Sequence, residues 1–509
     1  MSTRERMSAV DTAWLRMDSD RNLMMIVGVY EFDRKVDFGR LRDLLNSRLV
    51  AHRRFRSRVV RDVTGCHWEE CDDFDLDDHL IRIALPGRGT EGDLKKLVGE
   101  LASRPLDALK PLWQMHLIGN YAGGQALVVR IHHCIADGIA LIGVLLALTR
   151  DQPDAASAPS SRTRRANGEG ASRLRPLTAA AVKAIGTSSD IATKVLQGYG
   201  AILDTRGALA DAALRYAGVA TRVAKDAAAI ALMPNDDSTS LKGTPSGAKV
   251  VAWNEPLALD DVKAVGRALG CSVNDVLLAC MAGALRSYLT SRGERVDGFE
   301  LRAMVPVNLR DPRHWKDLGN KFGLVPLLLP IGVENPIARV FEVRRRMEEL
   351  KTGYTAVLSM GLLGAAGFAP RVLQKQALDF LTRKATAVMT NVPGPQQALY
   401  LAGAHVRRLM FWVPQSGDIG VGVSILSYDG GVQFGLITDR ALCAHPQRVI
   451  DRFEPEFERL VLALCMLPWG QVVDAEQAQH WLFPASLKSR VESAAKAAAN
   501  RSKSSARTR

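Results

Sequence analysis

Apolar residues follow two different periods along the first third of the chain. Where they recur at every second position, alternate side chains share one face of an extended segment, and we predict strands. Where they recur at every third or fourth position, we predict helices with one face on a core. The predicted strands are residues 23–32, 113–118 and 126–133, and the predicted helices are residues 9–17, 37–52 and 94–102. A turn at residues 120–124 should make a hairpin of the last two strands.

A second α/β region is predicted from residue 247 onward. A helix that begins at Asp260 should end at Gly270, and Ser272 should cap the following helix in a capping box with Asp275. A strand at 249–253, a strand followed by a loop within 299–310, a strand ending in the Pro/Gly corner 389–395, a meander of 409–414, 421–428 and 432–438, and a helix at 446–464 complete the pattern.

Two adjacent histidines end the second arm of the predicted hairpin. His133 is the last residue on the apolar face of that strand, and a helical stripe resumes after Gly138, so residues 134–138 should form a turn. A neutral imidazole there can accept a proton from a hydroxyl or thiol group. We expect the Asp137 carboxylate to hold the loop, and Gly138 to let the backbone turn and to leave space for a substrate.

Three other interpretations of these residues have to be weighed. His132 and His133 could be hydrogen-bonded core histidines, which is the common fate of buried polar side chains. A metal site lacks a third clustered ligand, so we expect no metal. Cys134 could be a covalent nucleophile, but its place one residue after His133 points it away from the face that carries His133.

Five motifs together resemble the bacterial wax ester synthase/diacylglycerol acyltransferase family, within the CoA-dependent acyltransferase superfamily. The central motif is His-His-x-x-x-Asp-Gly, which residues 132–138 match at every fixed position. The other motifs are Pro111-Leu112-Trp113, the segment 272–275, Asn391-Val392-Pro393-Gly394-Pro395 and the opening segment 7–14. Chloramphenicol acetyltransferases and peptide-synthetase condensation domains share the first motif, but the ordered set is specific. The resemblance covers roughly residues 5–475.

The resemblance implies an α/β fold of two domains like chloramphenicol acetyltransferase, each a mixed sheet with helices. An active-site tunnel should lie at the domain interface. We expect an N-terminal acyltransferase domain at 1–150, a linker and Ala-rich basic helical insert at 151–246, a C-terminal acyltransferase domain at 247–475 and a basic tail at 476–509.

The resemblance also implies an activity and roles for single residues. A fatty acyl group should pass from acyl-CoA to diacylglycerol, to a long-chain alcohol, or to both, with no cofactor and no acyl-enzyme. His133 would be the general base, and His132, Asp137 and Gly138 would complete the catalytic motif. Asn274, Asp275, Thr390 and Asn391 would border the substrate. Pro111, Leu112 and Trp113 would have a structural role, because an indole has no acid–base function near pH 7. The alternatives are an acyltransferase of the condensation or polyketide type that uses a carrier-protein thioester, and a non-catalytic protein that binds lipid surfaces.

Composition and charge narrow the partners and the compartment. The 509 residues carry a formal net charge of +13, which favours anionic surfaces. Nucleic acid is not expected, because no zinc-finger spacing or aromatic RNA-binding motif is present. The seven cysteines include no C-x-x-C pair and no signal peptide begins the chain, which predicts a cytoplasmic protein with reduced thiols. We expect peripheral association with the inner face of the plasma membrane or with lipid inclusions. The insert, the uncharged run 352–370 or the basic tail could provide that contact.

Overall fold

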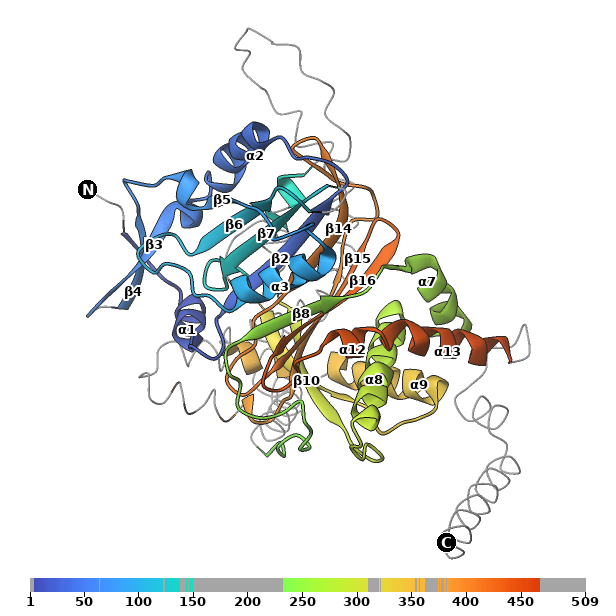
Figure 1. Cartoon of the computed structure of the whole chain (residues 1–509). Helices are drawn as coiled ribbons and strands as arrows, with labels where there is room; N and C mark the ends of the chain where they lie inside the picture. The colour runs from blue at the N-terminus through green and yellow to red at the C-terminus, as the bar shows by residue number, and fades with distance from the viewer. Residues whose placement is uncertain are drawn as a thin grey trace, which may run out of the picture. The chain divides into compact units, whose positions relative to one another are not determined.

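A computed structural model describes most of the predicted elements (Figure 1). The described residues are 4–137 without 64 and 122–123, 143–144, 146–149, 232–309, 320, 322–352, 355–356, 358–361, 374, 376, 380 and 382–466. Gly138, the insert up to residue 231, the last residues of the predicted C-terminal domain from 467 and the whole tail 476–509 lie outside them, as does most of the 352–370 run.

A six-stranded mixed sheet carries the histidine motif. Its strand order is β13-β14-β2-β7-β6-β5. The strands are β2 (Met25–Phe32), β5 (Leu80–Ile83), β6 (Trp113–Ile118), β7 (Gln125–His132), β13 (Tyr400–Leu401) and β14 (Ala404–Trp412). β5 pairs with β6 in parallel, and the other neighbours are antiparallel. The predicted hairpin of β6 and β7 is confirmed, and β7 ends one residue before His133.

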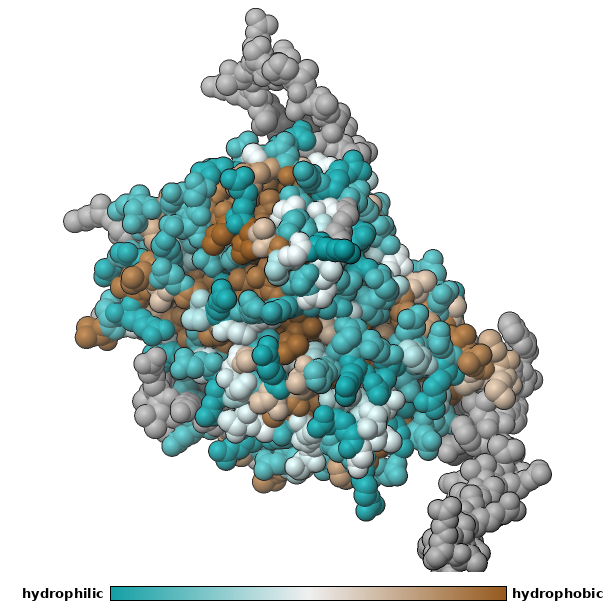
Figure 2. Space-filling view, in the orientation of Figure 1, coloured by the Kyte–Doolittle hydropathy of each residue, from teal (hydrophilic) through white to brown (hydrophobic). Residues whose placement is uncertain are grey.

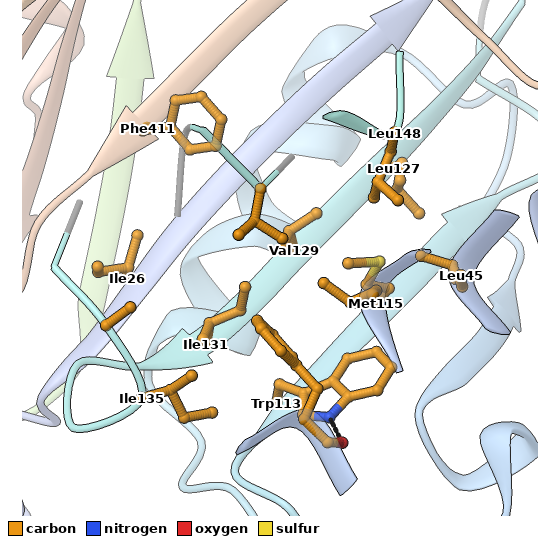
Figure 3. Close-up of a cluster of buried hydrophobic side chains, with 14 of the residues drawn as sticks. Ile26, Leu45, Trp113, Met115, Leu127, Val129, Ile131, Ile135, Leu148 and Phe411 are labelled. Carbon is orange, nitrogen blue, oxygen red and sulfur yellow. Dashed lines mark hydrogen bonds between the residues drawn. The ribbon is translucent and has the colours of Figure 1, made fainter. Parts of the chain in front are cut away.

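Both faces of this sheet are buried, because every residue of β2 and β7 lies inside the protein. One face packs into a core with Trp113 and the helices α1 (Ala9–Met17) and α2 (Phe38–Leu44), and Figure 3 shows part of this core. The other face packs against α3 (Glu91–Ala102). Ser8 caps α1, and Thr90 and Asp93 form a capping box on α3. The sheet is therefore a central layer, and close packing on both faces holds the end of β7 rigidly.

A second mixed sheet has the order β11-β10-β12-β15-β16-β8, with β9 (Leu257–Ala258) pairing to β16. Its strands are β8 (Lys249–Trp253), β10 (Leu301–Asn308), β11 (Phe322–Leu329), β12 (Ala387–Pro393), β15 (Val421–Tyr428) and β16 (Gly431–Asp439). β12 runs parallel to β10 and β15, whereas β16 is antiparallel to β15 and β8. The strands β1 (Arg4–Arg6), β4 (Gly65–Glu70) and β3 (Ser57–Asp62) form a third, small antiparallel sheet.

The predicted meander is wrong in one of its three strands. β15 and β16 form the expected hairpin, but β14 leaves that sheet and pairs with β2, with Leu409 opposite Tyr30. Both faces of β14 are apolar at its end, where Phe411 joins one core of the first sheet and Met410 joins the other. A strand that is buried on both faces needs a place inside a covered sheet, and β2 supplies that place.

The chain divides into two compact units that do not follow chain order. The first contains Met1–Leu259, Leu301–Leu328 and Glu348–Ile450, and the second contains Asp260–Glu300, Leu329–Met347 and Asp451–Arg509. The second unit includes most of α7 (Leu259–Ala268), α8 (Val273–Ser291), part of α9 (Pro336–Thr352), and α13 (Phe453–Cys465). The predicted helix at 446–464 is two helices, α12 (Gln447–Ile450) and α13. Inside the second unit, the buried Arg339 of α9 pairs with Glu456 of α13 at 2.5 Å.

Hydrophilic residues cover most of the face drawn in Figure 2, with smaller hydrophobic patches between them. Among the described residues, no single helix has the length and apolar composition needed to cross a membrane. One bent pair, α7 followed by α8 at 99°, meets the length and composition criteria when the two helices are taken together.

Candidate active site

His133 lies directly after β7, where two neighbouring segments fix its backbone. The His133 N–H donates to the carbonyl oxygen of Met24 (2.7 Å), and the His132 N–H donates to that of Leu112 (2.9 Å). The Pro111-Leu112-Trp113 motif and the start of β2 thus hold the two histidines from opposite sides. His133 itself is only 3% exposed.

Two aromatic side chains pack against the His133 ring. Trp14 of α1 stacks on the imidazole, with the ring centroids 4.2 Å apart, and Phe322 of β11 lies tilted at 5.5 Å. Burial lowers the pKa of His133 from 6.5 to about 4, although Asp137 and the Asn320 side chain act in the opposite direction. The ring is therefore neutral at pH 7, which is the form that accepts a proton.

A buried polar cluster connects α1 to the motif loop. The Asn320 Nδ2 group donates to Asp11 Oδ1 (2.8 Å) and to the carbonyl oxygen of His133 (2.9 Å). Arg54 forms an ion pair with Asp11 at 3.1 Å and donates to the carbonyl oxygen of Ile135 (2.7 Å). Segments that are far apart in the sequence therefore meet on both sides of His133.

His132 supports the turn by local contacts. Its Nδ1 accepts a hydrogen bond from the backbone N–H of Cys134 (3.1 Å), and its Nε2 lies 3.8 Å from Asp18 Oδ1. The same Asp18 oxygen accepts from the backbone N–H of Met24 (2.7 Å). These contacts give His132 a structural role in the loop. The ring of His133, by contrast, packs against Trp14.

The models of two protein domains match this chain. The catalytic-domain model of the wax ester synthase/diacylglycerol acyltransferase family matches residues 7–277, and the model of its C-terminal domain matches residues 318–461. The chain belongs to this family. It is an acyltransferase.

Relatives and solved structures agree with the family. A probable diacylglycerol O-acyltransferase of Mycobacterium tuberculosis is 29% identical over 469 residues, which cover 89% of this chain and 95% of the relative. The wax ester synthase/diacylglycerol acyltransferase of Marinobacter aquaeolei aligns over 89% of this chain and 98% of its own, with 21% identity and a TM-score of 0.60. The first condensation domain of the CDA synthetase aligns over 90% and 97%, with 14% identity and a TM-score of 0.53. Both structures have the same fold as this chain, which confirms the predicted α/β class.

Trp113 of the Pro111-Leu112-Trp113 motif packs and hydrogen-bonds inside the first unit. The Trp113 indole N–H donates to the carbonyl oxygen of Phe55 (2.7 Å), drawn as the dashed line in Figure 3, and the ring stacks on His79 at 4.5 Å. Trp113 is fully buried. These contacts fit the bracing role expected of the motif.

Cys134 has the environment of an inert thiol. It is fully buried, and burial raises the pKa of its thiol well above the ordinary value, so the group stays protonated. This disfavours the covalent alternative. No group of three or more His, Cys, Asp or Glu side chains in the described part of the chain is arranged to hold a metal ion.

The predicted substrate residues lie on other elements. In the second unit, Ser272 caps α8, and its N–H and hydroxyl contact the Asp275 carboxylate, so the predicted capping box is confirmed. Asn274 lies in the first turn of α8. In the first unit, the Thr390 hydroxyl donates to the carbonyl oxygen of Val423 (3.3 Å), and Asn391 follows it in β12. Contact of these four residues with substrate stays a prediction, as do the catalytic roles of His132, Asp137 and Gly138.

Sequence reasoning did not assign the residues that surround His133. Asp11 and Trp14 belong to the opening segment. The sequence predicts a turn at 319–323, and this is wrong at its end, because Phe322 is the first residue of β11. A single sequence marks the opening segment as part of a motif set, but it does not show that Asn320 and Phe322 meet it at one imidazole.

Proposed function

We propose that this acyltransferase moves a fatty acyl group from acyl-CoA to the hydroxyl group of diacylglycerol or of a long-chain alcohol, with His133 as the general base. The observation that carries the proposal is the neutral imidazole, held between Trp14 and Phe322 at the end of β7. The family and its named relatives support the choice of substrates.

The reaction needs one base and one acid, and the same ring serves as both. His133 takes the hydroxyl proton while the alcohol oxygen attacks the thioester carbonyl carbon. The tetrahedral intermediate then expels the CoA sulfur, which receives the proton from the imidazolium, and the products are an ester and free CoA. Burial disfavours the imidazolium, lowering the pKa of His133, so the charged ring returns its proton readily. A thioester is already activated, so no acyl-enzyme and no cofactor are required.

The decisive assay supplies the purified full chain with labelled palmitoyl-CoA and with competing dioleoylglycerol and hexadecanol, and separates the neutral lipids. We expect labelled triacylglycerol, wax ester or both. His133→Ala should abolish the product without unfolding the protein, whereas His116→Ala, which changes another buried histidine of the same sheet, should retain activity. Full activity of His133→Ala would reject the role of this residue. Preference for a carrier-protein thioester over palmitoyl-CoA would favour the condensation type.

Both proposed acceptors are water-insoluble, so we also propose that the enzyme works at the cytoplasmic surface of a membrane or lipid inclusion. The net charge of +13 supports an anionic surface. Flotation should recover the protein with vesicles that contain phosphatidylglycerol, and high salt should release it. Equal binding to purely zwitterionic vesicles would contradict the electrostatic part of this proposal.

A further inference from the structure

The backbone of the turn after β7 is held at its N–H groups and at its carbonyl oxygens in different ways. The Cys134 N–H donates to the His132 ring (3.1 Å), and the Ile135 N–H donates to the His132 carbonyl oxygen (3.0 Å). These bonds are local. The carbonyl oxygens of His133 and Ile135 instead accept from side chains of distant segments. Because buried carbonyl groups need partners, these two side chains help to fix where the turn lies.

The two donors reach the turn from opposite directions along the chain. Asn320 Nδ2 donates to the His133 carbonyl oxygen (2.9 Å) from 187 positions later in the sequence. Arg54 Nη1 donates to the Ile135 carbonyl oxygen (2.7 Å) from 81 positions earlier. The Ile135 side chain is fully buried in the core, where Figure 3 labels it. The backbone of this residue is therefore held both by its side chain and by its carbonyl oxygen.

One carboxylate joins the two donors to each other. Asp11 Oδ1 accepts from Asn320 Nδ2 (2.8 Å), and Asp11 Oδ2 forms an ion pair with Arg54 Nη2 at 3.1 Å. Asp11 is itself fixed in the first turn of α1, where its N–H donates to the Ser8 hydroxyl (3.0 Å). The Arg54 guanidinium also lies over the Trp68 ring, 5.4 Å from its centroid. Each of the two donors thus contacts the turn and the same buried carboxylate.

We propose that Asp11, Arg54 and Asn320 act as one bracket that positions the motif turn, and with it the His133 ring, for acyl transfer. Removing any member leaves a buried polar partner unpaired and frees one carbonyl oxygen of the turn. A misplacement of about 1 Å at a reacting group can lower the rate about 100-fold. This inference rests on the proposed role of His133 as general base and adds the positioning residues that hold it.

The alternative is that these side chains only contribute to stability. Arg56 provides a matched control in the same short helix, η2 (Arg53–Arg56), because it also forms one ion pair, with Glu70, and donates to a backbone carbonyl oxygen, that of Val50 (2.9 Å). Neither of these partners belongs to the motif turn. Arg54→Ala and Arg56→Ala should therefore lower the melting temperature to a similar extent, and only Arg54→Ala should impair acyl transfer.

The first test measures initial rates of the purified full chain with palmitoyl-CoA and dioleoylglycerol, at a temperature where every variant is folded. In Arg54→Ala, kcat should fall about 10- to 100-fold while KM for palmitoyl-CoA stays within about twofold. Arg56→Ala should keep the wild-type kcat. Arg54→Lys keeps the charge but lacks the planar fork that serves two acceptors, so its kcat should lie between those of Arg54→Ala and the wild type.

The second test asks whether the two donors act together. If they form one bracket, Asn320→Ala should lower kcat as Arg54→Ala does, and the double variant should be hardly worse than the more impaired single variant. Two independent contacts would instead multiply their effects. Should Arg54→Ala fail to fold, the same cycle can be measured with Arg54→Lys.

Two results would overturn the bracket: a kcat of Arg54→Ala equal to that of Arg56→Ala, or a double variant whose loss is the product of the two single losses. Either result leaves the proposed function standing if His133→Ala is inactive. An active His133→Ala enzyme, conversely, rejects the role of the base whatever the bracket variants do.

Discussion

Two buried polar clusters in the first unit are built around an asparagine, and they differ in how completely their atoms are paired. Around Lys249, Asn22 Oδ1 accepts from the lysine ammonium at 2.5 Å and Asn22 Nδ2 donates to two backbone carbonyls. Asp439 accepts from the N–H groups of Ser246 (2.9 Å) and Gly247 (2.8 Å). Around His133, by contrast, the ring Nδ1, the Nε2 of His132 and the Oδ1 of Asn320 lack a well-aligned partner among the described residues.

The difference separates a cluster that serves the fold from one that serves chemistry. An unmet buried donor or acceptor costs about 1–3 kcal/mol, so the His133 cluster contributes less to stability than its polar groups could. The Lys249 cluster ties β8 and β16 to the loop before β2, and its described side-chain atoms are satisfied. The His133 cluster keeps a ring whose proton must move.

The largest expected effect on stability comes from breaking the satisfied cluster with Asp439→Ala. This carboxylate is fully buried and also accepts from the Ser246 hydroxyl (2.8 Å) and the Ala441 N–H (3.0 Å), while the Lys249 ammonium lies 4.0 Å away. Removing it leaves several donors unmet and should lower the free energy of unfolding by about 3–5 kcal/mol, measured by urea denaturation.

The matched variant Asp439→Asn keeps one acceptor oxygen and should lose less stability. Both variants should retain the kcat of the wild-type enzyme at a temperature where they are folded. A large fall in kcat at full folding would show that the Lys249 cluster also serves the reaction, and the contrast between the two clusters would fail.

Much of the fold could be predicted from local patterns. The bounds of α1, β6 and β15 agree with the predicted segments 9–17, 113–118 and 421–428, because periodicity, caps and turn residues act over a few positions. The partner of β14 could not be predicted in the same way. Alternating apolar residues define a strand, but they do not say which of two sheets will receive it.

The site could be predicted only in its central part. His133 and the turn after it follow from the change of period at the end of β7. Asn320 contacts His133 from 187 positions away, and Trp14 comes from the first helix. Long-range convergence of this kind depends on the packing of α1 and β11 at the motif loop, and no local signal in one sequence encodes it.

A second test sharpens the contrast at the His133 ring. Trp14→Leu removes the stacked indole and admits water to one face, so the pKa of His133 should rise from about 4 toward 6.5. The neutral ring is the active form, and activity is lost as pH falls through this pKa. Wild-type kcat/KM should therefore hold down to about pH 5, and the variant should begin to lose it about one pH unit higher. We expect a stability loss of about 2 kcal/mol.

Trp14→Phe keeps a flat apolar ring against the imidazole and should leave the pH profile close to that of the wild type. The two variants together show whether Trp14 acts by excluding water from the imidazole or through a property specific to the indole. An unchanged acid limb in Trp14→Leu would mean that Trp14 does not control the protonation of His133.

The smallest effect at neutral pH should come from Lys249→Met, and its signature is the pH dependence of stability. Burial lowers the pKa of Lys249 from 10.5 to about 8. Between these values the unfolded chain binds more protons than the folded one, so this group contributes stability that is complete above about pH 10.5 and is lost as pH falls through about 8. Lys249→Met removes that dependence. At pH 7 the loss of the Asn22 contact and the removal of a buried charge should offset each other to within about 1–2 kcal/mol.

Urea denaturation of the wild type and of Lys249→Met between pH 7 and pH 10 measures the difference directly. The gap in unfolding free energy should shift in favour of the wild type as pH rises, because only the wild type gains from losing the buried charge. A constant gap across this range would mean that the folded and unfolded chains hold the lysine proton equally well. Lys249 would then keep its hydrogen bond to Asn22 with an unshifted pKa. Of His133 and Lys249, only His133 would have an environment that disfavours the protonated form.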